Sequence, residues 1–269
     1  MRKIVLLTGA SSGIGLACAN KLSQEGYRVY GSSREVESLQ DVHFRPIELN
    51  VTDDRSVSEA CDYILDIEGR IDILINNAGN GVAGPAYQMP IALAKKQFEV
   101  NFFGAVRMCN AVLPGMIARN EGLIVNIGSL AGLFGLPYQS MYSASKFAIE
   151  GFSQSLRMEL RNTGVNVTVI NPGDFRSSFS QNRDKCSFSI KNENLQQEYE
   201  AALKSMERDE MIAPYPDQLA ERLLQILNAE KPKHRYLVGQ LGQTIVPTLK
   251  RVLPCSVFEK LMNRHYGIK

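Results

Sequence analysis

The 269-residue sequence predicts an α/β protein: a single doubly wound (Rossmann-like) domain with a central parallel sheet of about seven strands and helices on both faces. Short apolar runs rich in β-branched residues alternate with longer stretches of helical periodicity, which indicates repeated strand–helix units. Right-handed crossovers then bring successive strands into one parallel sheet. No linker, repeat or low-complexity tract divides the chain, so residues 1–269 are expected to form one domain.

Seven runs have the length and composition of strands that are buried on both faces of a sheet. They span residues 3–9, 27–33, 43–51, 71–79, 122–129, 165–173 and 235–239. Other stretches repeat apolar residues at helical spacing. These predicted helices span residues 14–26, 54–69, 91–111, 142–162 and 217–227. In the first of them, Ile14, Cys18 and Leu22 share a face, and Gly26 is a stop signal.

Residues 174–216 interrupt the alternation of strands and helices. Within them, residues 193–210 have the pattern of an amphipathic helix. Its predicted inward face carries Leu195, Tyr199, Ala202 and Met206. An insertion between a strand and the next regular helix is a common place for a segment that closes over a ligand. We therefore predict that residues 174–216 form a lid over a substrate.

The composition excludes several classes of protein. Lys and Arg number 30 against 28 Asp and Glu, a net charge of +2, so no strongly basic face and no nucleic-acid partner are expected. The five cysteines form no CxxC pair and lie away from the three histidines, which indicates free thiols in a reducing compartment and no metal site. The N-terminal apolar run is too short for a secretory signal. The longest apolar stretch, residues 122–138, is interrupted by polar residues, glycines and a proline, so we predict a cytoplasmic protein without a transmembrane segment.

The stretch "TGASSGIG", residues 8–15, follows the first predicted strand and opens the first predicted helix. Gly9, Gly13 and Gly15 permit a tight turn in which a ligand can approach the backbone, and the amides at the helix start face an anion. The same turn could join a strand to a helix without any ligand. Its position between a strand and a helix favours a dinucleotide site.

Tyr142 and Lys146 lie one helical turn apart and therefore share a helix face. A free tyrosine titrates near ~10, so its phenolate is scarce at neutral pH. A neighbouring ammonium favours the phenolate and is expected to lower the pKa of Tyr142, and about three units of change would require ~4 kcal/mol. Tyr142 is thus a candidate proton donor and acceptor. Taken alone, the pair could also be a surface tyrosine and lysine that meet by chance.

Several motifs together resemble the short-chain dehydrogenase/reductase family over most of the chain. They are "TGASSGIG", "NNAG" at 76–79, Asn101, Ser129, "YSASK" at 142–146 and "NPG" at 171–173, in the family's order and spacing. The resemblance implies a catalytic set of Asn101, Ser129, Tyr142 and Lys146 and hydride transfer between a nicotinamide and a carbinol or carbonyl carbon. In this set Tyr142 moves the proton, Lys146 tunes it and Ser129 hydrogen-bonds the substrate oxygen. Asn101 links a water chain to Lys146.

The same resemblance implies a set of cofactor contacts. They are Gly9, Ser11, Ser12, Gly13, Ile14, Gly15, Arg34, Asn50, Val51, Asn77, Ala78, Gly79, Tyr142, Lys146, Pro172, Gly173, Phe175 and Ser177. Ser33 stands where NAD-specific relatives usually carry an acidic residue, and Arg34 could pair with a 2′-phosphate, so NADP is favoured over NAD. Glu35 beside Arg34, and Ser12 in place of a basic residue, leave NAD open. Two departures from the family pattern are Asn50, usually Asp, and Gly128, often a second serine.

Apolar residues surround the reacting groups. Between Ser129 and Tyr142 stand Leu133, Phe134, Leu136, Pro137, Tyr138 and Met141. Any one of them could simply pack in the core or at a subunit contact, but together they indicate a hydrophobic alcohol or ketone, such as a steroid-like or other lipid-like carbonyl. The predicted substrate contacts are Ser129, Leu136, Tyr138 and Phe179. "GPAYQMP" at 84–90 and the tail at 249–267 are similar to the steroid- and retinol-converting branch of the family.

Residues 240–269 are predicted to form a C-terminal helical extension. Its apolar stripe of Phe258, Leu261 and Met262 could cover the active site, pack on a partner or touch a membrane. Its basic residues Lys250, Arg251, Lys260 and Arg264 keep a peripheral membrane contact open. Relatives pair through their two long central helices, which implies a homodimer or homotetramer.

Two other functions stay open beside the NADP-dependent enzyme. One is a catalytically silent dinucleotide-binding regulator, and the other is an NAD-dependent dehydrogenase of a smaller alcohol. An intact set of Ser129, Tyr142 and Lys146 favours an active enzyme over the regulator.

Overall fold

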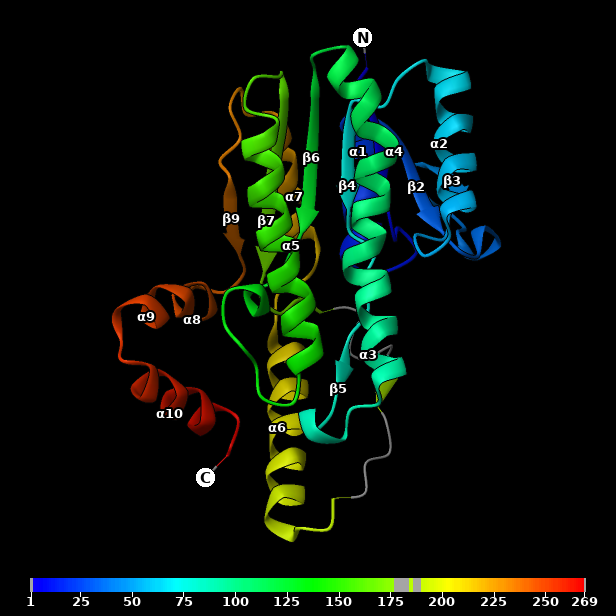
Figure 1. Ribbon diagram of the computed structural model, residues 1–269. Helices are drawn as coiled ribbons and strands as arrows, with labels where there is room; N and C mark the ends of the chain where they lie inside the picture. Colours follow the sequence, from blue (N-terminus) through cyan, green and yellow to red (C-terminus); the bar gives the residue numbers. More distant parts are fainter. Residues whose placement is uncertain (1, 177–183, 186–189, 269) are drawn as a thin grey trace.

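The computed structural model describes residues 2–176, 184–185 and 190–268, and it confirms the predicted α/β fold with a seven-stranded parallel sheet (Figure 1). The strands are β1 (Ile4–Leu7), β2 (Arg28–Ser33), β3 (Arg45–Glu48), β4 (Ile73–Asn76), β6 (Gly122–Ile127), β7 (Val165–Pro172) and β9 (Arg235–Val238). Their order is β3-β2-β1-β4-β6-β7-β9, and every neighbouring pair is parallel. From β1 to β3 the chain adds strands on one side of β1, and from β4 onward it adds them on the other side. The point between β1 and β4, where this order switches, opens a crevice at the carboxyl ends of the strands.

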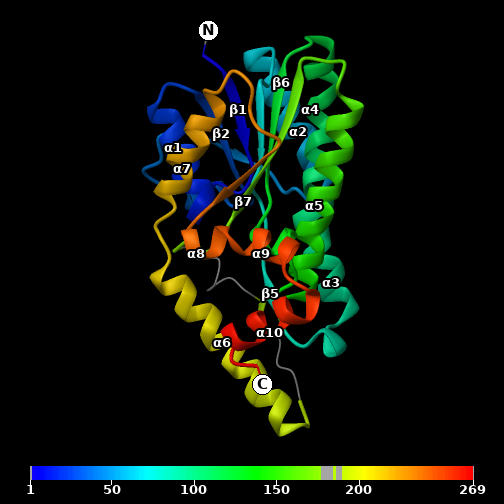
Figure 2. The ribbon, with the colours of Figure 1, turned by 90° about the vertical axis from the view of Figure 1, so that its left-hand side faces the viewer.

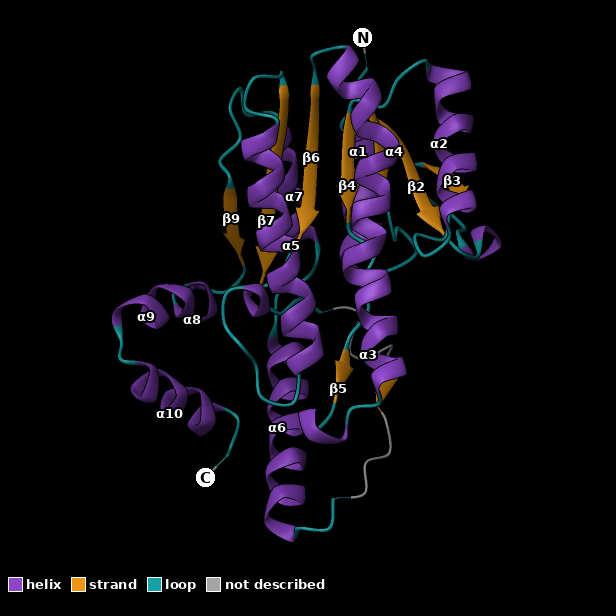
Figure 3. Cartoon of the chain, viewed as in Figure 1, coloured by secondary structure: helices purple, strands orange, loops and turns teal. Residues whose placement is uncertain are grey.

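Helices cover both faces of the inner strands of the sheet, and alternate residues of each strand point to opposite sides. In β1, Ile4 and Leu6 belong to one core cluster, and Val5 and Leu7 belong to the other. The first cluster lies under α2 (Asp54–Glu68), α4 (Gly104–Ala118) and α5 (Ser140–Glu159); the second lies under α1 (Gly13–Gln24) and α7 (Asp217–Leu227). Figures 2 and 3 show these two helix layers on either side of the strands.

The helix predicted at 91–111 is longer and is interrupted. It runs as α3 (Ile91–Phe98), a π-helical turn η3 (Glu99–Phe103) and α4, which ends at Ala118. π-helical turns inside α-helices are often found at functional sites, and this one contains the buried Asn101. By length and composition alone the stretch Ile91–Ala118 could cross a membrane. Here its α4 half packs against the sheet through four buried side chains: Met108, Cys109, Val112 and Met116.

A second group of elements lies beyond the carboxyl ends of the strands (Figure 1). It contains the β5 (Val82–Ala83) and β8 (Asp184–Lys185) pair, α6 (Glu193–Ile212), α8 (Leu241–Thr244), α9 (Val246–Val252) and α10 (Cys255–His265). Three short turns of 3₁₀ helix complete the described elements: η1 (Val36–Ser38), η2 (Ala86–Gln88) and η4 (Leu130–Gly132). Of these elements, α6 lines the crevice with Met206, Asp209 and Glu210, and Tyr266 lines it directly after α10.

The C-terminal helices fold back onto this group. Phe258 packs against Leu130 and Phe134, and Tyr266 packs against Met206 on α6. Of the predicted stripe, Phe258 is buried and Met262 is half-buried, whereas Leu261 faces out. On the predicted inward face of α6, Tyr199, Ala202 and Met206 are buried, whereas Leu195, in the first turn, is exposed.

Candidate active site

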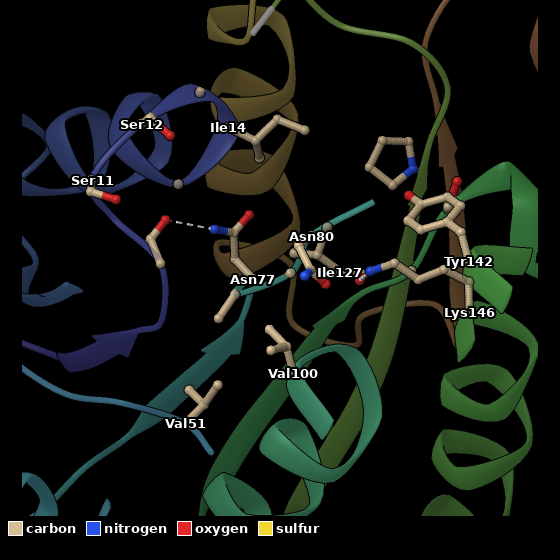
Figure 4. Close-up of a pocket in the computed structure, with 18 of the residues that line it drawn as sticks. Ser11, Ser12, Ile14, Val51, Asn77, Asn80, Val100, Ile127, Tyr142 and Lys146 are labelled. Carbon is tan, nitrogen blue, oxygen red and sulfur yellow. Dashed lines mark hydrogen bonds between the residues drawn. The ribbon is translucent and has the colours of Figure 1, made fainter. Parts of the chain in front are cut away.

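A cavity of about 1200 Å³ runs along the carboxyl ends of the strands, from the first turn of α1 to α6 and the end of α10. Most residues predicted to bind the cofactor or substrate line it. They are Gly9, Ser11, Ser12, Gly13, Ile14, Gly15, Arg34, Asn50, Val51, Asn77, Ala78, Gly79, Ser129, Leu136, Tyr142, Lys146, Pro172, Gly173 and Phe175. Figure 4 shows the start of α1 on one side of the cavity and Tyr142 and Lys146 on the other. Ser177 and Phe179 lie outside the described residues.

Hydrogen bonds and close contacts hold the glycine turn, residues 8–15, beside the cavity. Gly9 has a φ of 71°, which glycine adopts without strain. A Cβ on Gly15 would lie 2.0 Å from the Gly9 oxygen and 2.5 Å from Asn77 Nδ2, so no other residue fits there. Asn77 Nδ2 donates to the Gly9 and Thr8 oxygens at 2.9 and 3.0 Å. Ser12, the N-cap of α1, gives no side-chain cap, so the first amides of the helix remain available to an anion in the cavity.

Tyr142 and Lys146 project from α5 into the other half of the cavity. Lys146 Nζ lies 5.9 Å from the centroid of the Tyr142 ring and donates to the Ile127 oxygen at 2.9 Å. Desolvation by burial lowers the pKa of Lys146 to about 8. Among the described residues no carboxylate pairs with this ammonium, so its field acts on the neighbouring phenol without a competing anion.

Ser129 is held by its backbone and leaves its hydroxyl hydrogen available. Its Oγ accepts from the Ala131 amide at 3.1 Å as the N-cap of η4, and its own amide donates to Asn171 Oδ1 at 2.9 Å. Asn171 Nδ2 in turn donates to Glu150 Oε1 at 2.6 Å, and Arg235 forms an ion pair with Glu150. The chain Arg235–Glu150–Asn171 therefore fixes the backbone of the serine loop.

The position of the Asn171 side chain explains why residue 128 is a glycine. A Cβ at this position would come within 2.1 Å of Asn171 Oδ1. The glycine that stands where relatives often have a second serine thus makes room for the Asn171 side chain. The sequence marked Gly128 as a departure but gave no sign of its partner.

Two predicted site residues lie outside the cavity lining. Asn101 is buried behind it: its Oδ1 accepts from the Asn80 amide at 2.9 Å, and its Nδ2 donates to the Asn80 oxygen and to Ser145. Asn80 itself lines the cavity, so Asn101 reaches the site through it. Tyr138, predicted as a substrate contact, instead packs against Tyr199 with ring centroids 5.1 Å apart and the rings tilted by 50°.

Several lining residues were missed by sequence reasoning. Besides Asn80, they include a first group of Ser32, Thr52, Lys95, Lys96 and Val100 and a second group, toward α6 and the end of α10, of Gln139, Met206, Asp209 and Tyr266. Met206 was predicted to face inward on its helix, which was the only signal available for any of the second group. Tyr266 reaches the cavity because Ser205 Oγ donates to the His265 oxygen at 2.9 Å and His265 Nε2 lies 2.7 Å from Asp209 Oδ2. These contacts fasten α10 to α6.

Comparisons with known proteins agree with this geometry. The model of the short chain dehydrogenase family matches residues 3–186. The chain is 38% identical to a 3-ketodihydrosphingosine reductase of Bacteroides thetaiotaomicron over 268 residues, 99% of each protein. A short-chain dehydrogenase from Streptomyces avermitilis superposes with a TM-score of 0.81 at 30% identity, covering 97% of this chain and 96% of that one. A serine dehydrogenase complexed with NADP⁺ superposes with a TM-score of 0.76 at 28% identity, covering 89% and 95%.

Proposed function

Since the chain belongs to the short-chain dehydrogenase/reductase family, we propose that it is an NADP(H)-dependent oxidoreductase that interconverts a hydrophobic secondary alcohol and ketone. One observation carries this proposal. The Tyr142–Lys146 pair and Ser129 line the same cavity as the glycine turn, so a proton-transfer group and a dinucleotide site face one space.

The cavity residues fit a nicotinamide dinucleotide. The uncapped amides of α1 suit a pyrophosphate, and Ile14, Val51 and Val100 offer apolar contact for flat rings. When bound, the nicotinamide supplies the hydride that is exchanged with the carbinol carbon. The remaining steps belong to this chain.

Tyr142 donates its proton to the carbonyl oxygen during reduction and takes it back during oxidation. The Lys146 ammonium stabilises the phenolate that forms, and its own position is fixed by the Ile127 oxygen. The Ser129 Oγ accepts one hydrogen bond from the Ala131 amide, which orients the hydroxyl, and its hydrogen donates to the substrate oxygen. The Arg235–Glu150–Asn171 chain holds that serine in place.

A lipid-like ketone is the substrate class that we propose. Leu136, Met206 and Tyr266 line the end of the cavity beyond Tyr142. The relative that shares 38% of residues over its whole length is named as a reductase of 3-ketodihydrosphingosine, which supports a long-chain carbonyl. A steroid-like ketone of similar hydrophobicity is the second member of this class.

NADP is the proposed cofactor. Arg34 follows β2, lines the cavity and makes no ion pair within the described part of the chain, so its charge is available to a 2′-phosphate. The NADP⁺ complex of the related serine dehydrogenase supports this preference. An NAD-dependent dehydrogenase of a smaller alcohol is the alternative.

We further propose a cytoplasmic homodimer or homotetramer. Ile117 on α4 and Phe147 and Met158 on α5 are exposed, which supports pairing of these helices between subunits. Sedimentation velocity measures the assembly. A strict monomer would count against it.

The test of the proposed activity is a matched pair of tyrosine variants, assayed by NADPH absorbance with long-chain and steroid ketones. Tyr142→Phe should lower turnover by about 10²- to 10⁴-fold, the usual contribution of a general acid. Tyr138→Phe removes a hydroxyl outside the cavity lining and should stay within about twofold of the parent. Near-normal turnover by a folded Tyr142→Phe protein would refute the mechanism. Absence of turnover by the parent with every ketone would favour the silent regulator.

A further inference from the structure

Exposed apolar side chains gather around the C-terminal helices. Of the 19 large apolar side chains exposed in the described part of the chain, nine lie within residues 211–261. They are Met211, Ile212, Tyr215, Leu241, Ile245, Leu249, Val252, Val257 and Leu261. The first three adjoin the others, because Gln240 Nε2 donates to the Ile212 oxygen at 3.1 Å. We call this surface the α8–α10 face.

The residues of the α8–α10 face that lie on α8 and α9 form one stripe. Leu241, Ile245 and Leu249 are spaced four residues apart, and i→i−4 backbone hydrogen bonds link each to the next, so α8 and α9 act as one helix. Leu241 is 82% exposed and Val252, three residues beyond Leu249, is 75% exposed. Figure 2 shows these helices crossing the side of the molecule that faces the viewer, with α10 below them.

The inner side of the same helices is already occupied. Val246 and Leu253 pack into the cluster of Phe134 and Phe258, and Met262 packs beside them. The outward apolar residues are therefore not needed for the core. A helix that is apolar on both sides is normally buried, so a second apolar surface is expected to cover this one.

The charge of residues 240–269 indicates what kind of surface covers the α8–α10 face. Residues 240–269 hold five of the chain's 30 basic residues and only one of its 28 acidic residues, which leaves 25 basic and 27 acidic residues elsewhere. Arg251, Lys260 and Arg264 are exposed and form no ion pair with any described residue. A segment that exposes both apolar side chains and unpaired cations matches the boundary of an anionic bilayer, where acyl chains lie beneath negative headgroups.

We infer that the α8–α10 face docks the protein on an anionic lipid surface. A second copy of the chain is disfavoured as the occupant, because both copies would bring a segment of the same net positive charge into a two-fold contact. The face also adjoins the substrate end of the cavity, since Met206 and Tyr266 line the cavity from the helices that carry it. Docking would thus hold that end of the cavity beside a source of apolar molecules.

The experiment is co-sedimentation of the full chain with vesicles of phosphatidylcholine, with or without phosphatidylglycerol, at low and high salt. The parent should bind the anionic vesicles more tightly than the neutral ones, and salt should weaken this binding. Leu241→Ser with Val252→Ser should weaken binding to both vesicle types about tenfold or more. Arg251→Gln, Lys260→Gln and Arg264→Gln together should remove most of the preference for anionic lipid, again about tenfold or more.

The matched control is Tyr63→Ser with Ile67→Ser on α2, where both side chains are about half exposed on another part of the molecule. This variant should bind vesicles as the parent does. Circular dichroism and NADPH binding report that each variant is folded. Binding needs no turnover, so its failure is distinct from failure of the proposed activity.

Three results would overturn the inference. One is no binding of the parent to anionic vesicles at low salt. Another is unchanged binding by the Leu241→Ser, Val252→Ser variant. The third is a dimer in solution that this variant dissociates, which would assign the α8–α10 face to a second copy.

Discussion

The two ends of the cavity are built differently. At the dinucleotide end, Gly9 and Asn77 follow β1 and β4, which are neighbours in the sheet, and Gly15 lies in the first turn of α1. At the substrate end, Leu136, Met206 and Tyr266 come from three separate segments. The first end is therefore fixed by hydrogen bonds from Asn77 to the turn after β1, whereas the second depends on how α6 and α10 pack.

This difference predicts unequal tolerance to substitution. A Cβ added to Gly9 or Gly15 would meet backbone atoms of a neighbouring turn, so the dinucleotide end should resist change. The Met, Leu and Tyr side chains that stand beside Gln139 and Asp209 at the substrate end can repack at little cost, so that end should accept other residues and other ligands.

The largest effect is expected for Gly15→Ala. Because the new Cβ would meet the Gly9 oxygen at 2.0 Å, the start of α1 must move away from the turn. NADPH binding should weaken by about 1000-fold or more, corresponding to ~4 kcal/mol, as titration of nucleotide fluorescence would show. The matched control is Gly151→Ala on α5, where an added Cβ meets nothing within 4 Å. Equal affinities for the two variants would contradict a rigid dinucleotide end.

The next effect concerns Lys146, which lies where the two ends meet. Burial lowers its pKa from the ordinary value of 10.5 to about 8. Between these pH values the unfolded chain binds more protons than the folded one, so the free energy of unfolding rises with pH across this window. The rise should total about 3 kcal/mol, and the cost of burying the charge is fully present below pH 8.

Urea unfolding of Tyr142→Phe with and without Lys146→Met isolates this effect, because the phenol cannot contribute. The stability of the methionine variant relative to its parent should fall by about 3 kcal/mol between pH 7.5 and pH 10.5. A difference that stays constant with pH would mean that the folded protein holds Lys146 at its ordinary pKa.

The sequence predicted the dinucleotide end far better than the substrate end, for a physical reason. Tight turns admit few residue types, so Gly9, Gly13 and Gly15 identify themselves by type and spacing. Tyr142 and Lys146 are four residues apart, and helix periodicity alone brings them together. Tyr266 carries no such mark, because its place depends on two contacts between α6 and α10. Tyr138 lies outside the lining because its ring packs against Tyr199, a tertiary contact that no local pattern reveals.

The contact between Gly128 and Asn171 was also invisible in the sequence, and it predicts a coupled pair of variants. Gly128→Ala should displace the Asn171 side chain from the Ser129 amide, and Asn171→Ala removes the same hydrogen bond. Each should lower kcat about 10- to 100-fold through misplacement of Ser129, with little change in NADPH affinity. Because Asn171→Ala opens room for the new methyl group, the double variant should lose much less than the product of the two losses. Multiplicative losses would show that Gly128 acts independently of Asn171.

The smallest effect is expected at Arg34, an exposed residue of the dinucleotide end. A solvated arginine gains only a modest energy from a 2′-phosphate, so Arg34→Gln should lower kcat/KM for NADPH about tenfold and leave that for NADH unchanged. Since the contact is between exposed charges, high salt should shrink the parent's preference toward that of the variant. The matched control is Arg55→Gln on α2, an exposed arginine that pairs with Glu59 outside the cavity. It should leave kcat/KM unchanged for both NADPH and NADH. An equal fall in kcat/KM for NADPH and NADH would mean that the Arg34 guanidinium contacts a group that both cofactors share. Discrimination between the cofactors would then come from other residues of the lining, and Ser12 and Ser33 would be the next to exchange.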